Sequence, residues 1–218
     1  LPGEGPEWCA VLPRVWRDRD EPALRTLLEW ARALGFTGVL IGNLGHLPLV
    51  RGLNFHLYGD YGLNVFNSRS LAYLKDKELE SACVSFELRF AQIRDLKKVL
   101  RAEAIVYGRL PLMITENCII HNHTGRHSCE EGQRLVDRKG EHFPVVKAWG
   151  CRNEILNAKT LFLADKAGDY SRLGLWAVRL MFTTESPAEC VRALERYQGR
   201  GSWQPAGHTR GLYYRDVE

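Results

Sequence analysis

The stretch "GVLIGNLGHLPLVRGLNFHLYGD", residues 38–60, contains two short apolar runs separated by one helical segment. The runs "GVLIGN" (38–43) and "LNFHLYGD" (53–60) have the length and apolar content of buried strands, and "LGHLPLVRG" between them is expected to form a short helix. Two strands joined by a single helix pair in parallel through a right-handed crossover. The stretch therefore predicts an α/β fold with a parallel sheet.

The same alternation of strands and helices continues on both sides of this stretch. Further strands are expected at 8–15, 81–88, 104–113 and 174–182, and further helices at 20–35, 67–76, 91–101 and 186–198. Near-continuous apolar strands are buried on both faces, so a doubly wound sheet and a (β/α)₈ barrel both fit. A barrel needs eight strands and about 250 residues, whereas we find six βα-like units. We therefore expect a partial or open TIM-barrel-like fold in a single domain, 1–218.

Composition and charge exclude several classes of protein. The chain has 218 residues, of which 45% are hydrophobic and 26% charged, and a net charge of +4 that permits an anionic substrate or RNA. No apolar run approaches the roughly 18–20 residues that cross a bilayer, so we expect no membrane association. Six cysteines are too few for a disulfide scaffold, and we expect a cytoplasmic location. The chain opens without Met, so we expect further sequence upstream.

Polar residues recur directly after the expected strands. They are Arg14, Asn43, Asp60, Asn64, Glu87 and Arg109. Any one of them could serve as a cap or a loop hydrogen-bonding group, but in a barrel all six would face the carboxyl-terminal mouth, where active sites are built. We expect Arg14, Asp60, Glu87 and Arg109 to line a catalytic pocket, because arginines bind carboxylates bidentately and a carboxylic acid can move protons.

Three cysteines lie in polar sequence after the fifth expected strand. Cys118 and Cys129 occur in "ENCIIHNHTGRHSCEEG" (116–132), and Cys151 follows in "WGCRNEILN". The segment "RLVDRKGEHFPVVKAWG" between them reads as a β-hairpin that carries the chain from Cys129 back to Cys151. We therefore expect an inserted cysteine-bearing loop and hairpin over 114–160 that brings the three thiols into one metal site.

The spacing of these cysteines leaves the metal open. Zinc ligands usually come in pairs two to four residues apart, which is not the case here, and thiolates also suit copper(I) and iron–sulfur centres. His127 could join from the same loop as Cys129, with His121 and His123 as competitors, or all three histidines could be exposed loop residues. The remaining cysteines are expected in the core: Cys9, Cys83 and Cys190.

Several segments resemble one known family. They are "DYGLNVFNSRSL", "SFELRFAQIRDL", "VYGRLPLMITENCII", "LVDRKGEHFPVVKAWGCRNEILNAKTLFLADK", "LMFTTESPAEC" and "TRGLYYRDVE". Together they are similar to the collagenase-like peptidases of unknown catalytic type, the U32 peptidases, and most of all to the C-terminal segment of long bacterial members. The resemblance implies a TIM-barrel-related fold with additional sequence upstream. The expected partner is that upstream portion or a second copy of the chain.

The resemblance also implies an activity and a cofactor. The family was named for proteolysis, but several members are understood as oxygen-independent hydroxylases of RNA bases or quinone precursors. In those members four cysteines bind a [4Fe–4S] cluster, and prephenate is the oxygen donor. Carried onto this chain, three of the ligands are Cys118, Cys129 and Cys151. The fourth family cysteine falls at His127, where the family pattern Cys-x-Cys is replaced by "HSC".

Three classes of function follow from these features. The favoured one is an iron–sulfur-dependent hydroxylase acting on RNA or a small aromatic substrate. The second is a collagenase-like protease, although no Ser–His–Asp arrangement, GxSxG elbow or HExxH motif is legible. The third is a non-catalytic barrel segment with a structural metal site. A zinc ion held by all four predicted ligands would be coordinatively full and therefore structural.

Overall fold

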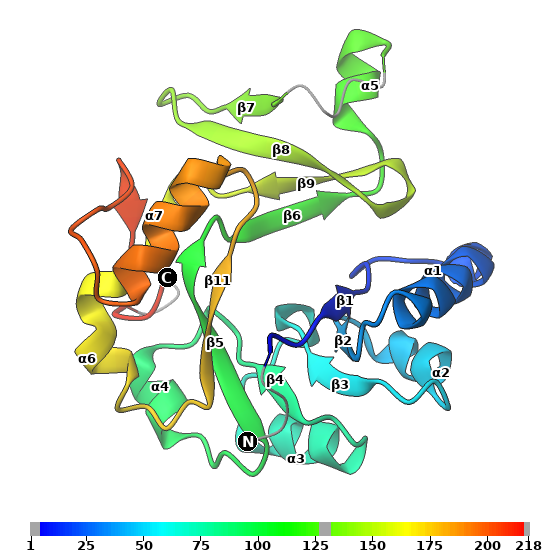
Figure 1. Cartoon of the computed structure of the whole chain (residues 1–218). Coiled ribbons are helices and arrows are strands. Elements are labelled where there is room, and N and C mark those ends of the chain that lie inside the picture. Colours follow the sequence, from blue (N-terminus) through cyan, green and yellow to red (C-terminus); the bar gives the residue numbers. More distant parts are fainter. Residues whose placement is uncertain (1–4, 127–131, 216–218) are drawn as a thin grey trace. The chain divides into compact units, whose positions relative to one another are not determined.

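The structure is a computed structural model, and it describes residues 5–126 and 132–215. The chain divides into two compact units, and Figure 1 labels their helices and strands. Unit 1 comprises Leu1–Ala104 and Leu173–Ala177. Unit 2 comprises Ile105–Arg172 and Val178–Glu218. The boundary between them falls inside strand β5 (Arg101–Gly108).

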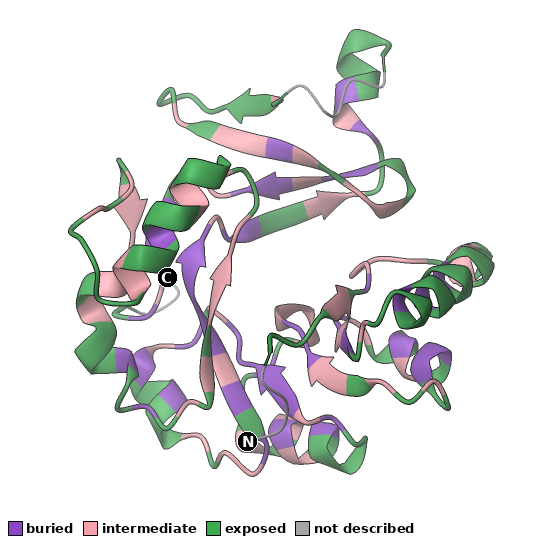
Figure 2. Cartoon of the chain, viewed as in Figure 1, coloured by how far each residue is buried: buried purple, intermediate pink, exposed green. Residues whose placement is uncertain are grey.

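Unit 1 is built on a parallel sheet with the strand order β1-β2-β3-β4-β5. The first four strands are β1 (Cys9–Val11), β2 (Gly38–Ile41), β3 (His56–Gly59) and β4 (Ser81–Cys83). The helices between them are α1 (Glu21–Ala33), α2 (Leu47–Val50), α3 (Ser68–Asp76) and α4 (Phe90–Asp95). Strands β2 and β3, which define the fold in the sequence, pair in parallel as predicted. Buried residues concentrate on β2 and β4, whereas β3 has intermediate and exposed residues before the buried Gly59 (Figure 2).

Helix α1 has one buried face and one exposed face that both carry apolar residues. Leu24, Leu28 and Ala31 recur at helical spacing and are buried, while a second apolar stripe of Leu27, Trp30 and Leu34 is exposed. Helix α3 begins as predicted, because the side chain of Asn67 accepts a hydrogen bond from the backbone N–H of Ser70 at 3.0 Å.

Two predicted elements of this region were wrong in extent. The helix expected over 91–101 ends at Asp95, because the ammonium group of Lys98 donates to the carbonyls of Ile93 (2.6 Å) and Leu96 (3.3 Å) where further helical turns would have continued. The strand expected over 104–113 is two strands, β5 and β6 (Pro111–Thr115), separated at Gly108. Gly108 has a φ of 122°, which is open only to glycine in practice.

Unit 2 contains an antiparallel sheet with the strand order β6-β9-β8-β7. Its other strands are β7 (Arg134–Val136), β8 (His142–Ala148) and β9 (Arg152–Leu156). The hairpin expected around "DRKGE" is confirmed, since β7 and β8 pair in antiparallel fashion. The Asp137 carboxylate stabilises its turn by accepting the N–H groups of Lys139 (2.8 Å) and Glu141 (2.9 Å).

The remaining strands of unit 2 continue the larger sheet beyond β5. The elements that remain in unit 2 are β10 (Thr160–Phe162), β11 (Ala177–Met181), β12 (His208–Thr209), α5 (Ile119–Thr124), α6 (Ala167–Tyr170) and α7 (Pro187–Tyr197). Strand β10 pairs antiparallel with β5, so the larger sheet is mixed beyond its parallel part. Tyr197 of α7 links the two strands, because its hydroxyl donates to the carbonyl of Val106 at 2.6 Å and accepts from the N–H of Leu163 at 2.9 Å.

The fold class is confirmed as α/β, with a parallel sheet flanked by helices (Figure 1). The TIM-barrel-like arrangement stays a prediction. The strands follow the order β1-β2-β3-β4-β5-β10-β12, and β11 pairs with β5 outside this order. Among the described residues, no helix has both the length and the apolar character that a membrane span requires.

Candidate functional site

The carboxyl ends of strands β1 to β3 gather polar residues at one edge of unit 1. A side chain built on Gly42, directly after β2, would have its Cβ 3.7 Å from both Arg14 Cα and Asp60 Oδ2. A Cβ on Gly62 would lie 2.8 Å from Arg14 Cδ, so the loop after β3 packs closely on the arginine. The structure therefore brings Arg14 and Asp60 together as predicted, and two glycines make the close approach possible.

Arg14 is held by an aromatic side chain. Its guanidinium carbon lies 5.6 Å from the centre of the Tyr61 ring, which in turn lies 5.9 Å from the ring of Phe86. The backbone carbonyl of Arg14 accepts a hydrogen bond from Asn43 at 3.3 Å. Within residues 5–126 and 132–215 no carboxylate forms an ion pair with this guanidinium. Arg14 can therefore bind an anionic ligand at this edge.

His46 is a site residue that sequence reasoning missed. Its side chain is fully buried next to Trp16, at 5.9 Å between ring centres, and its Nε2 lies 3.1 Å from the carbonyl of Pro13. Burial lowers the pKa of His46 to about 4, although the charge of Asp60 acts in the opposite direction. The imidazole is therefore neutral at pH 7. Among the described atoms, its Nδ1 has no hydrogen-bond partner.

A neutral imidazole whose Nε2–H donates to Pro13 presents Nδ1 as an acceptor. This nitrogen is itself buried, so the acceptor lies in the interior of unit 1 behind the edge that holds Arg14 and Asp60. Nothing in the sequence indicates this role, because His46 lies inside the short segment 44–52, whose apolar residues predict a helix on packing grounds alone.

The other two predicted catalytic residues have different surroundings. Glu87 is exposed in the loop after β4, and its N–H donates to Ser85 Oγ at 3.3 Å. Arg109 belongs to unit 2, where its guanidinium donates to the carbonyls of Asn157 (3.0 Å) and Ala158. Arg109 thus ties down the loop between β9 and β10, a structural role that the sequence did not predict.

Arg109 also lines a pocket of about 390 Å³ in unit 2. The charged and aromatic residues around it include Tyr107, Glu185, Glu189 and Trp203. The capping hydrogen bonds from Ser186 and the nearby charges of Arg192 and Arg109 hold the pKa of Glu189 below its usual range. The pocket therefore has a carboxylate at its rim that stays ionised.

Two of the predicted metal ligands emerge from the same end of the antiparallel sheet. Thr115 at the end of β6 pairs with Asn153 near the start of β9, so the chain leaves β6 where it enters β9. Cys118 follows that exit by three residues and Cys151 precedes β9 directly. The N–H of Ile119 donates to Asn153 Oδ1 at 2.8 Å and fastens the two segments to each other.

The two cysteines differ in environment. Cys118 is buried at the start of α5, where its sulfur accepts the N–H of His121 at 3.4 Å and contacts an apolar cluster that includes Val145 and Ile155. Cys151 is exposed and has a φ of 61°. The left-handed conformation costs a non-glycine residue about 1 kcal/mol and occurs preferentially at functional positions.

An ion pair between the buried Arg152 and the half-exposed Glu116 supports the segment around Cys151. The Arg152 side chain is 1% exposed, and it donates to Glu116 and to the carbonyl of Trp149 at 3.1 Å. A Cβ on Gly150 would lie 2.6 Å from Arg152 Nη1, so a glycine is required before Cys151. The backbone conformation at Cys151 is thus fixed by the residues on both sides.

The other two predicted ligands, His127 and Cys129, lie outside the described residues. In the part of the chain that is described, no group of three or more His, Cys, Asp and Glu side chains is arranged to hold a metal ion. The competitors His121 and His123 lie on α5 and are exposed. The complete metal site therefore stays a prediction, of which the structure supplies the Cys118 and Cys151 positions.

Comparison with known sequences gives one match. The family described as Peptidase family U32 matches residues 5–137, which is more than half of the chain and includes β1 to β7. The comparisons with curated proteins and with solved structures gave no match. The matched region contains Arg14, His46 and Asp60 as well as Cys118.

Proposed function

Because this chain belongs to peptidase family U32, we propose that it is a family enzyme with a metal centre built on Cys118, Cys129, Cys151 and His127. The favoured activity is an iron–sulfur-dependent, oxygen-independent hydroxylation of RNA or of a small aromatic substrate. The observation that carries the proposal is Cys151, an exposed thiol held with a φ of 61° at the sheet end from which Cys118 also emerges.

The described donors fit such a centre. Thiolates are the preferred ligands of iron–sulfur clusters and also bind zinc. The sulfur of Cys118 accepts the backbone N–H of His121 at the start of α5. When bound, a cluster would supply one-electron chemistry, whereas zinc with four protein ligands would be structural. This second outcome corresponds to a non-catalytic protein with a structural metal site.

The carboxyl edge of unit 1 supports a substrate site for an anion. Arg14 offers its guanidinium, held over Tyr61, to a carboxylate. Prephenate, a dicarboxylate, is the proposed co-substrate. Asp60 and Glu87 would be the proton-handling groups, because each follows a strand of the parallel sheet.

Peptide hydrolysis is the second candidate. It is supported by the family match, since the family is described as a peptidase family. A synthetic collagen-like peptide incubated with the purified chain tests it. Cleavage that Asp60→Asn abolishes would favour the hydrolase over the hydroxylase.

The metal centre is tested by anaerobic purification followed by counting iron, sulfide and zinc. We expect about four irons with matching sulfide and broad visible absorption for a cluster. Cys118→Ser and Cys151→Ser should each lose the metal, and Cys190→Ser on α7 should retain it. His127→Cys should raise iron occupancy. Stoichiometric zinc would favour the structural metal site over the hydroxylase. The absence of any metal would overturn both proposals.

A further inference from the structure

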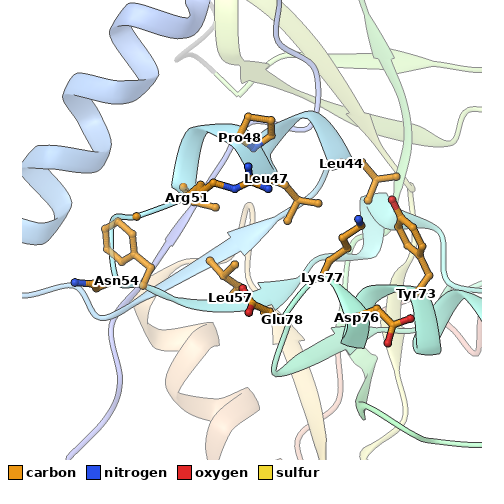
Figure 3. A pocket seen from close by; sticks show the side chains of 13 residues that line it. Leu44, Leu47, Pro48, Arg51, Asn54, Leu57, Tyr73, Asp76, Lys77 and Glu78 are labelled. Atoms are coloured by element: carbon orange, nitrogen blue, oxygen red, sulfur yellow. The ribbon is translucent and has the colours of Figure 1, made fainter.

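A pocket of about 570 Å³ lies in unit 1 between α2, β3 and α3 (Figure 3). Its apolar wall includes Leu44, Leu47, Phe55, Leu57 and Tyr73, and its charged residues are Arg51, Asp76, Lys77 and Glu78. The volume is in the range of pockets that bind small molecules.

The pocket is separate from the edge that holds Arg14 and Asp60. It is formed by the loops 51–55 and 77–79, which lead into the amino ends of β3 and β4. Asp60 of the candidate substrate site instead follows the carboxyl end of β3. Because α2 has only four residues, it leaves Leu57 of β3 partly uncovered as the base of the pocket.

Charges of both signs line this pocket without pairing. In the described part of the chain, Arg51, Asp76, Lys77 and Glu78 form no ion pair with any residue. The ammonium of Lys77 instead lies 5.3 Å from the ring centre of Tyr73. In Figure 3, Arg51 and Lys77 come from opposite sides of the pocket, with Leu57 and Glu78 below them. The pocket thus offers two cations, two anions and an apolar base.

The backbone around the pocket is held in unfavourable conformations. Glu78 (φ 66°) and Asn54 (φ 54°) are both left-handed, and both line the pocket. Glu78 follows the C-cap of α3, a position where glycine is preferred. A glutamate here gives up backbone stability and places a carboxylate at the pocket wall.

We propose that this pocket binds a zwitterionic ligand with an apolar side chain, of the class of free apolar amino acids and short peptides. Arg51 binds its carboxylate from one side of the pocket, and Glu78 with Asp76 binds its ammonium group. The apolar side chain of the ligand lies on Leu47, Leu57 and Tyr73. The balance of two positive and two negative side chains selects a ligand that carries both charges over one that carries a single charge.

The test is calorimetric titration of the full chain with four probes. They are the dipeptide leucyl-phenylalanine, its acetylated and amidated form, phenylbutyrate and phenylbutylamine. We expect the dipeptide to bind most tightly, with the two singly charged probes weaker by roughly fivefold and the capped peptide weaker still, because an exposed ion pair contributes at most about 1 kcal/mol.

Two variants separate the charges. Arg51→Gln should weaken the dipeptide roughly fivefold and leave phenylbutylamine unchanged, while Glu78→Gln should weaken the dipeptide and leave phenylbutyrate unchanged. Lys75→Gln, on α3 but outside the pocket, is the matched control and should change neither affinity. Equal affinities for all four probes, no binding of the dipeptide, or equal effects of Lys75→Gln and Arg51→Gln would overturn the proposal. None of these outcomes depends on the metal centre.

Discussion

Both carboxylate oxygens of Glu116 hold the buried guanidinium of Arg152, with Nε donating to Oε2 at 3.0 Å and Nη2 donating to Oε1 at 2.9 Å. The pair is asymmetric, since the Arg152 side chain is 1% exposed and that of Glu116 is 50% exposed. Glu116 thus compensates a charge that cannot reach water.

We expect Glu116→Gln to lower the free energy of unfolding by about 1–2 kcal/mol, because a buried arginine loses its counter-ion while the exposed glutamate gains little. Urea unfolding measures the change. Glu141→Gln is the control, since Glu141 pairs with Lys159 at 3.2 Å with both side chains largely exposed. It should cost less than about 0.5 kcal/mol. Equal costs for the two variants would contradict a special role for the buried pair.

His46 should make stability depend on pH. Its pKa is about 4 in the folded chain and 6.5 for a histidine exposed to water, so the unfolded chain binds a proton below pH 6.5 that the folded chain does not. Stability should therefore fall as the pH drops from about 6.5 to about 4, by a total of about 3 kcal/mol from this group.

Urea unfolding at several pH values, with His46→Gln beside the natural chain, isolates this contribution. The variant should lose this part of the pH dependence, whereas His142→Gln, on the exposed end of β8, should retain it. A His46→Gln variant with the same slope as the natural chain would assign the pH dependence to other groups.

Two substitutions at Cys151 distinguish its role in metal binding from the strain of its backbone. Cys151→Gly should stabilise the metal-free chain by up to about 1 kcal/mol, because glycine adopts a φ of 61° without penalty. The same variant should lose the metal. Cys151→Ser keeps the strain and should lose the metal without the gain in stability. Full metal retention in both variants, measured by elemental analysis, would remove Cys151 from the ligand set.

Arg109→Ala, judged from the sequence alone, should remove anion binding with little loss of stability. The hydrogen bonds from Arg109 to Asn157 and Ala158 change the expected effect on stability. We expect a loss of about 1–2 kcal/mol in thermal or urea unfolding, because two loop carbonyls lose a charged donor. An unfolding curve that coincides with that of the natural chain would show that the loop does not need this tie.

The exposed apolar residues on α1 and β1 predict association. Trp8 and Trp30 are more than 60% exposed, as is Val11 on β1, which lies at the end of the strand order. We expect concentration-dependent self-association in light scattering, and we expect Trp30→Glu to reduce it. Lys75→Glu introduces a glutamate on α3 and should not. A monomer at all concentrations would contradict the prediction.

The sequence was most informative where local signals and burial agree. The parallel pairing of 38–43 with 53–60, the helix over 67–76 and the "DRKGE" hairpin each rest on residues whose preference matches their final environment. The end of α4 was missed, because it depends on the distant end of the Lys98 side chain, which no periodicity reveals.

The candidate site was predictable in the same uneven way. Arg14 and Asp60 follow strands, so parallel topology alone brings them to one edge. His46 follows no visible rule, because its role comes from burial against Trp16 and Pro13. Arg109 follows β5 because the strand expected over 104–113 ends at Gly108, and its contacts with 157 and 158 depend on a loop whose position the sequence does not encode locally.

Gly108 limits the paths by which this sequence can change. A Cβ at this position would lie 2.1 Å from the carbonyl oxygen of Met181, and the φ of 122° excludes side chains independently. A steric clash and a backbone conformation thus each exclude a side chain at this position. A change elsewhere that removed only one of the two would still leave glycine required. In a scan of all single substitutions we expect position 108 to accept no replacement, whereas Glu78 and Cys151 accept glycine. The point at which β5 ends is therefore among the least evolvable positions of the described chain, even though glycine contributes no side-chain contact there.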